Sequence, residues 1–128
     1  MFTELIAAAQ AVARPIDLAN GGQAASVGAA LLGSDRQIYT GVCIDMACGI
    51  GFCAEASAMA EMLKRHATRI EAAVAVNAQG LVLSPCGRCR EMMLQLDPAN
   101  AATRVALPGG RELSLAELMP HHWLQDAA

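Results

Sequence analysis

Aromatic and charged side chains are scarce in this 128-residue chain. Aromatic residues make up 3% of it and charged residues 16%, and nine basic against twelve acidic side chains give a formal charge of −3. Polynucleotide binding needs clustered Lys and Arg and aromatic stacking surfaces. These shortages argue against a nucleic-acid partner.

The chain also has no long apolar run and no basic leader. No stretch reaches the ~18 uninterrupted apolar residues typical of a membrane-spanning helix. The first four residues, Met-Phe-Thr-Glu, carry an early acid where a signal peptide would be basic. We therefore expect no membrane partner and a cytoplasmic location.

A disulfide framework is disfavoured by the cysteine count. The chain has five cysteines, an odd number, and no evident secretion signal. Their presence therefore points to metal binding or catalysis. The five are Cys43, Cys48, Cys53, Cys86 and Cys89.

The length and composition predict one domain over residues 1–128 with a core of small and aliphatic side chains. Hydrophobic residues make up 55% of the chain, which excludes general disorder. Runs of strand and helix composition alternate, which predicts an α/β fold whose mixed or parallel sheet is covered by helices on both faces. Helices are predicted at 3–13, 53–65, 86–96 and 114–118, and strands at 26–32, 37–43, 72–76 and 104–107.

The most informative local pattern is Pro-Cys-x-x-Cys at residues 85–89. Cys86 and Cys89 are three residues apart, so at the start of a helix their thiolates share one face and can hold one metal ion. A redox pair, or two small buried hydrophobic residues, is the alternative interpretation of this pattern alone.

A second pattern, Cys53-Ala54-Glu55, stands at the start of another predicted helix. Cys53 supplies a third thiolate, and three protein ligands leave tetrahedral zinc one open position for water or hydroxide. Glu55 is placed to move a proton between that water and a substrate nitrogen. Together the two patterns are typical of zinc deaminases.

The chain resembles the cytidine deaminase superfamily, in its small free-nucleoside branch. Residues 27–31 (VGAAL), 53–55 (CAE), 84–90 (SPCGRCR) and 118–120 (LMP) carry the resemblance. Within that branch, residues 38–42 and 83–90 look especially like blasticidin-S deaminases. The resemblance implies a three-layer α-β-α sandwich with a mixed sheet of about five strands, usually in a homotetramer.

The resemblance also implies roles for the residues of these motifs. One zinc ion per subunit is expected on Cys53, Cys86 and Cys89, with Glu55 as the proton shuttle. The backbone N–H of Ala54 is expected to help hold the base carbonyl.

The chain departs from the family where the substrate is expected. Cys43 and Asp45 occupy the positions of an Asn-x-Glu pair that grips ribose hydroxyls, and Ala25 occupies the position of an aromatic residue that stacks on the pyrimidine. Asp45 can still accept a hydroxyl hydrogen bond, whereas a thiol is a poor substitute for an amide.

Four further residues have a functional and a structural interpretation each. Phe52 is expected to line the pocket or pack beneath it rather than stack on the base. Trp123 matches a C-terminal aromatic position that closes a neighbouring subunit's pocket in the family's tetramers, and packing within its own chain is the alternative. At the positions of Arg88 and Arg90 the resemblance implies an arginine that hydrogen-bonds a zinc-bound sulfur, and a solvated or interface salt bridge is the alternative for each.

These features predict a zinc-dependent hydrolase that releases ammonia from cytidine, deoxycytidine or a related base. The same chemistry on another aminated heterocycle, such as blasticidin S, is the nearest alternative. A non-catalytic, zinc-stabilised binding module is the alternative from another class, and Glu55 argues against it because a structural site needs no general base.

Overall fold

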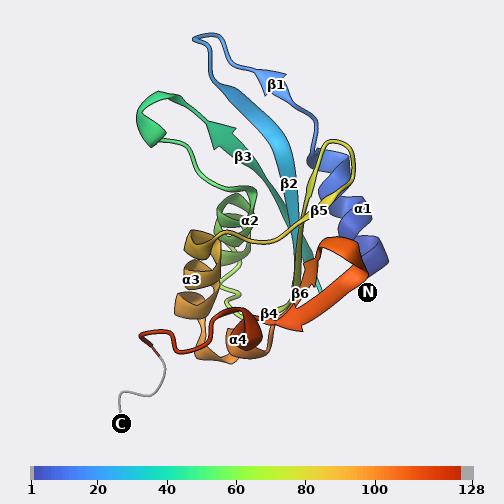
Figure 1. The fold of residues 1–128 in the computed structure, drawn as a ribbon, viewed down its shortest axis with the longest axis vertical. Helices are drawn as coiled ribbons and strands as arrows, with labels where there is room; N and C mark the ends of the chain where they lie inside the picture. The colour runs from blue at the N-terminus through green and yellow to red at the C-terminus, as the bar shows by residue number, and fades with distance from the viewer. Residues whose placement is uncertain (1, 125–128) are drawn as a thin grey trace.

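The strands of the computed structural model, which describes residues 2–124, form one mixed sheet (Figure 1). The strand order is β1-β2-β4-β6-β7, with β3 paired to β2 and β5 paired to β4. Among the strands of the described residues, β4 and β6 are the one parallel pair. The elements are α1 (Phe2–Val12), β1 (Ile16–Asp17), β2 (Gln23–Gly33), β3 (Ile38–Asp45), α2 (Ala54–Leu63), β4 (Ile70–Asn77), β5 (Val82–Leu83), α3 (Gly87–Leu96), β6 (Arg104–Leu107), β7 (Arg111–Ser114) and α4 (Leu115–Leu118).

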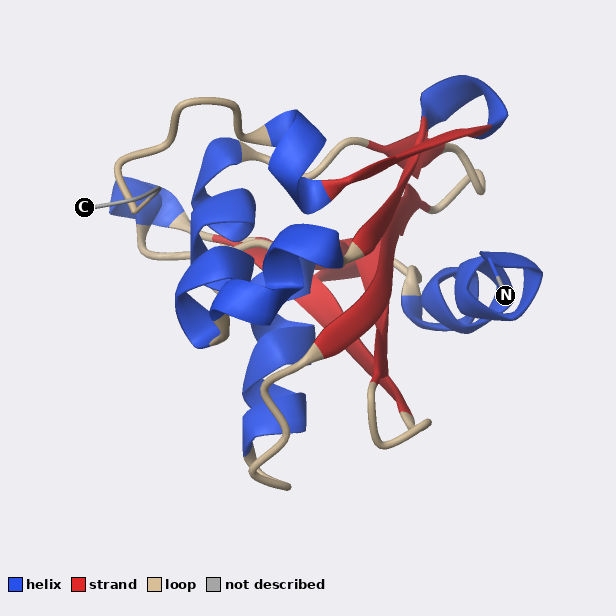
Figure 2. Cartoon of the chain, turned by 90° about the horizontal axis from the view of Figure 1, so that it is seen from below, coloured by secondary structure: helices blue, strands red, loops and turns tan. Residues whose placement is uncertain are grey.

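Helices cover both faces of the sheet, which confirms the predicted α-β-α sandwich. In Figure 2, α1, marked by the N-terminus, lies on one side of the strands, and α2, α3 and α4 lie on the opposite side. Alternate residues of β2 point to opposite faces: Ala29 and Leu31 join the core under α2 and α3, whereas Ala30 and Leu32 join the core under α1. Over residues 2–124 the sheet has seven strands, of which β1 and β5 have two residues each, so five longer strands match the expected number.

Small residues let the helices approach the sheet closely. A Cβ on Gly28 would lie 2.2 Å from the carbonyl oxygen of Ala9 in α1, and one on Gly41 would lie 2.3 Å from the backbone nitrogen of Ala58 in α2. This close approach explains how a chain so poor in aromatic residues fills its core with Ala, Leu, Val and Met.

The predicted elements are present, with differences at their ends. Cys53 and Cys86 precede α2 and α3 as extended N-cap residues. The short C-terminal helix has the predicted capping box, with Ser114 accepting from the N–H of Glu117. Both hairpin strands are longer than predicted: β2 also pairs with β1 and β4, and β3 continues to Asp45, which pairs with Gln23 of β2. No helix within residues 2–124 has the length and apolar character needed to cross a bilayer.

Candidate metal centre and active site

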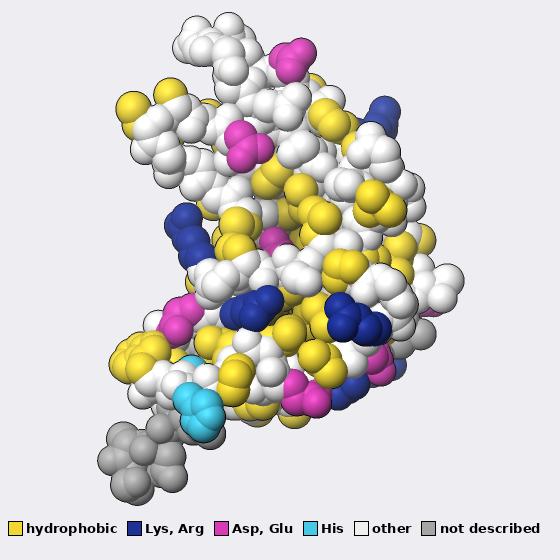
Figure 3. All heavy atoms as spheres, in the orientation of Figure 1, with side chains coloured by type: hydrophobic (Ala, Val, Ile, Leu, Met, Phe, Trp, Pro, Cys, Tyr) yellow, Lys and Arg dark blue, Asp and Glu magenta, His cyan; other side chains and the backbone are white. Residues whose placement is uncertain are grey.

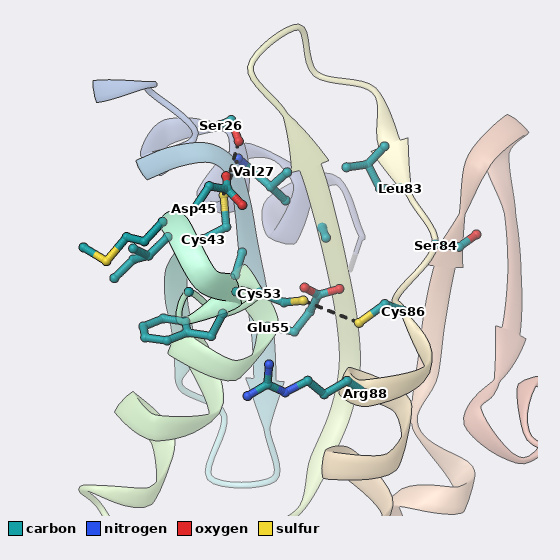
Figure 4. A pocket seen from close by; sticks show the side chains of 17 residues that line it. Ser26, Val27, Cys43, Asp45, Cys53, Glu55, Leu83, Ser84, Cys86 and Arg88 are labelled. Carbon is teal, nitrogen blue, oxygen red and sulfur yellow. Dashed lines mark hydrogen bonds between the residues drawn. The ribbon is translucent and has the colours of Figure 1, made fainter. Parts of the chain in front are cut away.

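Three thiols meet where α2 and α3 begin. The sulfur atoms of Cys53, Cys86 and Cys89 lie within 4.8 Å of one another, and those of Cys53 and Cys86 are 3.4 Å apart (Figure 4). Tetrahedral zinc with Zn–S bonds of about 2.3 Å holds its sulfur ligands about 3.8 Å apart, so the cluster fits the ion. Both helix N-termini also favour negative charge on these sulfurs.

Burial and neighbouring groups shift the pKa values of the thiols in this cluster. Cys89 is fully buried, and its pKa is raised by that burial and by the negative charges of Glu55 and Cys53. Burial opposes ionisation of Cys86 as well, but hydrogen bonds, the first from the backbone N–H of Cys89, outweigh it and lower the pKa of Cys86. A divalent cation among these sulfurs removes the cost of ionising them.

Glu55 lies beside this cluster on the first turn of α2 and is only 6% exposed. Burial raises the pKa of its carboxyl above the ordinary value. No salt bridge within residues 2–124 involves Glu55. A carboxyl with raised proton affinity in a pocket suits a group that accepts and returns protons.

A cavity of about 510 Å³ opens next to the thiols and is lined by Cys53, Ala54, Glu55 and Cys86 on that side. This volume is in the usual range for small-molecule sites. Figure 3 shows that the Lys and Arg side chains on this face are scattered among acidic and hydrophobic ones, which is unlike the basic groove of a polynucleotide-binding protein.

A second wall of the cavity is formed by β2 and β3. Cys43 and Asp45 both line the cavity, at the positions the sequence indicated. Ser26 lines it too and lies 3.3 Å from the Cys43 sulfur, a placement that the sequence analysis missed. The cause is a break in the β2–β3 pairing between Ala24 and Gly28, with Ala25 in the left-handed region at φ 64°.

The two arginines beside Cys89 differ in their surroundings. Arg88 is exposed and lines the cavity, pointing back toward α2 in Figure 4. The Arg90 guanidinium donates no hydrogen bond to a cysteine sulfur among the described residues. It donates hydrogen bonds to the carbonyl oxygens of Pro85 and Leu118, each at 2.9 Å. Arg90 therefore anchors the loop before Cys86 to the end of α4 and orients that ligand indirectly.

The remaining candidate residues differ in whether they line the cavity. Phe52 and Ala54 line the cavity, and Phe52 is held by paired backbone hydrogen bonds to Ile44. Trp123 is 72% exposed, lies outside this cavity and donates a hydrogen bond to Glu91 on α3 of its own chain. Cys48 is exposed in the loop after β3 and does not line the cavity.

Comparison with known proteins agrees with this site. Residues 3–104 match the family model described as the cytidine and deoxycytidylate deaminase zinc-binding region. A cytidine deaminase of Halalkalibacterium halodurans is 32% identical over 97 residues, which are 73% of this chain and 74% of the relative.

Two further comparisons involve Mycobacterium tuberculosis. Its cytidine deaminase is 35% identical over 71 residues, 55% of this chain, and the match spans about half (53%) of the relative's length. A crystal structure of cytidine deaminase from the same organism superposes with a TM-score of 0.81 at 28% identity, covering 95% of this chain and 96% of that one. The family match, this fold and the three-thiol cluster lead to one conclusion: the chain belongs to the cytidine and deoxycytidylate deaminase family and carries that family's zinc-binding region.

Proposed function

We propose that this chain is a zinc-dependent hydrolytic deaminase that converts the amine of a free aminated pyrimidine, cytidine or deoxycytidine, to a carbonyl and releases ammonia. The observation that carries the proposal is the position of the buried Glu55 carboxyl beside three converging thiols, two of which, Cys53 and Cys86, line the same cavity as Glu55. A structural zinc site would need a fourth protein ligand and no such acid.

The proposed chemistry assigns Glu55 two proton transfers. A bound zinc ion supplies the Lewis acidity that lets water act as a nucleophile near neutral pH. Glu55 takes a proton from the water that attacks the amine-bearing carbon and places it on the adjacent ring nitrogen. It then carries the second water proton to the departing amine, the C–N bond breaks, and ammonia leaves behind a carbonyl.

Other residues of the cavity are proposed to orient the ring. The N–H of Ala54 belongs to the first turn of α2, where backbone donors have no intrahelical acceptor, so it is suited to hold the ring carbonyl. Phe52 supplies apolar contact at the cavity wall, and Asp45 accepts a hydrogen bond from a substituent of the ring. Arg88 is proposed to act on the charged sulfurs from the cavity side.

We propose that residues 1–128 act as one domain within a homotetramer. The exposure of Trp123 supports a role at a neighbouring subunit's cavity, since 72% of this residue is uncovered in the single chain. A cytoplasmic location is proposed as well, because a reducing compartment keeps the three thiols available for metal. Light scattering of the protein and its Trp123→Ala variant tests the assembly.

The test of the proposed activity is ammonia release by zinc-loaded protein from cytosine, cytidine, deoxycytidine and blasticidin S. We expect release from cytidine and deoxycytidine. Release from blasticidin S alone would mean that the protein performs the same chemistry on another heterocycle. The resemblance of residues 38–42 and 83–90 to blasticidin-S deaminases allows this outcome. Zinc binding with no release from any of the four would favour a non-catalytic module.

A further inference from the structure

The cavity wall that β2 and β3 form, away from Cys86, carries three linked polar side chains: Ser26, Cys43 and Asp45 (Figure 4). We propose that Ser26 is a specificity-determining residue and that Cys43 is a positioning residue which joins it to Asp45. The three form a wall that selects ring substituents rich in hydrogen-bond donors. This inference rests on the proposed function, because the substituent belongs to the ring that loses its amine.

The direction of each hydrogen bond in this wall follows from which of the side chains carry a hydrogen. The Cys43 sulfur lies 3.8 Å from Asp45 Oδ2 and 3.3 Å from Ser26 Oγ, and it accepts from the N–H of Val27 at 3.3 Å. A thiol has one hydrogen and a carboxylate can only accept. The thiol hydrogen therefore points to Asp45, and the Ser26 hydroxyl donates to the sulfur.

This arrangement uses the side-chain donors of Ser26 and Cys43 within the wall. On this wall, the three side chains present to the cavity the lone pairs of Ser26 Oγ and of the Asp45 carboxylate, which are acceptors only. Cys43 is 7% exposed, so it acts from behind the other two. A substituent that brings hydroxyl groups finds partners on this wall, whereas a phosphate meets the negative charge of Asp45 and no free donor.

The position of Ser26 depends on the irregularity in β2. In a regular strand, successive side chains point to opposite faces, so Ser26 and Val27 would not both reach one cavity. The left-handed backbone at Ala25 and the break in pairing before Gly28 interrupt this alternation. Both residues line the cavity as a result. The hydroxyl of Ser26 therefore forms a part of the cavity wall that the thiol of Cys43 does not form.

The experiment compares kcat/KM for cytidine, 5′-deoxycytidine and 2′,3′-dideoxycytidine in the zinc-loaded wild type and in Ser26→Ala. We expect Ser26→Ala to lower kcat/KM for cytidine about tenfold. This change corresponds to the loss of one hydrogen bond that contributes about 1.4 kcal/mol. The loss should vanish on whichever analogue lacks the hydroxyl that Ser26 contacts. Ser34→Ala, an exposed serine at the β2–β3 turn, is the matched control and should match wild type.

Two Cys43 variants test the positioning role. Cys43→Ala should reproduce the substrate-dependent loss of Ser26→Ala, and Cys43→Ser, which restores one donor and an acceptor, should recover most of it. An unchanged kcat/KM in Ser26→Ala, or an equal loss on all three substrates, would overturn the inference. If the zinc-loaded wild type turned over none of the three, the proposed function would fail first and this inference with it.

Discussion

The sulfur atoms of Cys53 and Cys86 lie 3.4 Å apart although 33 residues separate them in the sequence. Each is the N-cap residue of a different helix, and Cys89 completes the cluster from the first turn of α3. Two helix N-termini are thus brought together around one set of ligands. A metal ion there links α2 to α3 in addition to any part in chemistry.

Removal of one ligand should therefore cost both metal and stability. We expect Cys86→Ala to lose stoichiometric zinc and to unfold about 10 °C below the wild type, because the free energy of metal binding contributes to folding. Elemental analysis and calorimetry measure the two effects. Cys48→Ala removes an exposed thiol outside the cluster and should keep both zinc and stability. Full zinc content in Cys86→Ala would contradict the assignment of the ligands.

Arg90 should matter for stability more than its neighbour Arg88. Its side chain joins the carbonyls of Pro85 and Leu118, so Arg90→Met should lower the free energy of unfolding by about 2 kcal/mol. Arg88→Met, a matched change at an exposed position, should leave stability nearly unchanged. Urea denaturation compares them, and equal destabilisation by both variants would argue against the anchoring role of Arg90.

The β2–β3 turn should show a pH-dependent contribution to stability. The Tyr39 hydroxyl donates to Asp35, which lowers the pKa of that carboxyl, and the backbone N–H of Gln37 adds a second hydrogen bond at 3.1 Å. A folded-state pKa below the unfolded one stabilises the protein above the unfolded value, about 3.9, and the benefit is lost as the pH falls through the folded value.

Tyr39→Phe removes the hydroxyl that lowers this pKa. The stability difference between wild type and Tyr39→Phe should be largest near pH 7 and should shrink as the pH falls below about 4. Urea unfolding over a pH series measures this difference. A difference that stays constant, or grows toward acid pH, would show that the hydroxyl does not stabilise ionised Asp35.

The local motifs predicted the metal centre well, for a physical reason. Pro85 and the Ala-rich composition after Cys53 mark helix starts, and a helix start fixes where its first side chains point. The cavity wall was only partly predictable. The resemblance to the family's Asn-x-Glu positions indicated Cys43 and Asp45, but nothing in the sequence indicated Ser26.

Ser26 was missed because its placement depends on strand register. The left-handed conformation at Ala25 has no signature in the sequence, since Gly or Asn would be the usual residue at such a φ. The partners of Arg90 are likewise set by packing: the Leu118 carbonyl lies 28 residues away along the chain. Periodicity predicts which face of an element is apolar, whereas contacts of this kind depend on how distant elements meet.

The most direct test of the central claim measures zinc content and ammonia release in one preparation of Glu55→Gln. The account predicts stoichiometric zinc, because the three thiols are untouched, and a turnover of cytidine about 100- to 10,000-fold below wild type, because the proton carrier is gone. Glu61→Gln, on the exposed side of the same helix, should keep both. A Glu55→Gln protein with full zinc and wild-type turnover would contradict the account.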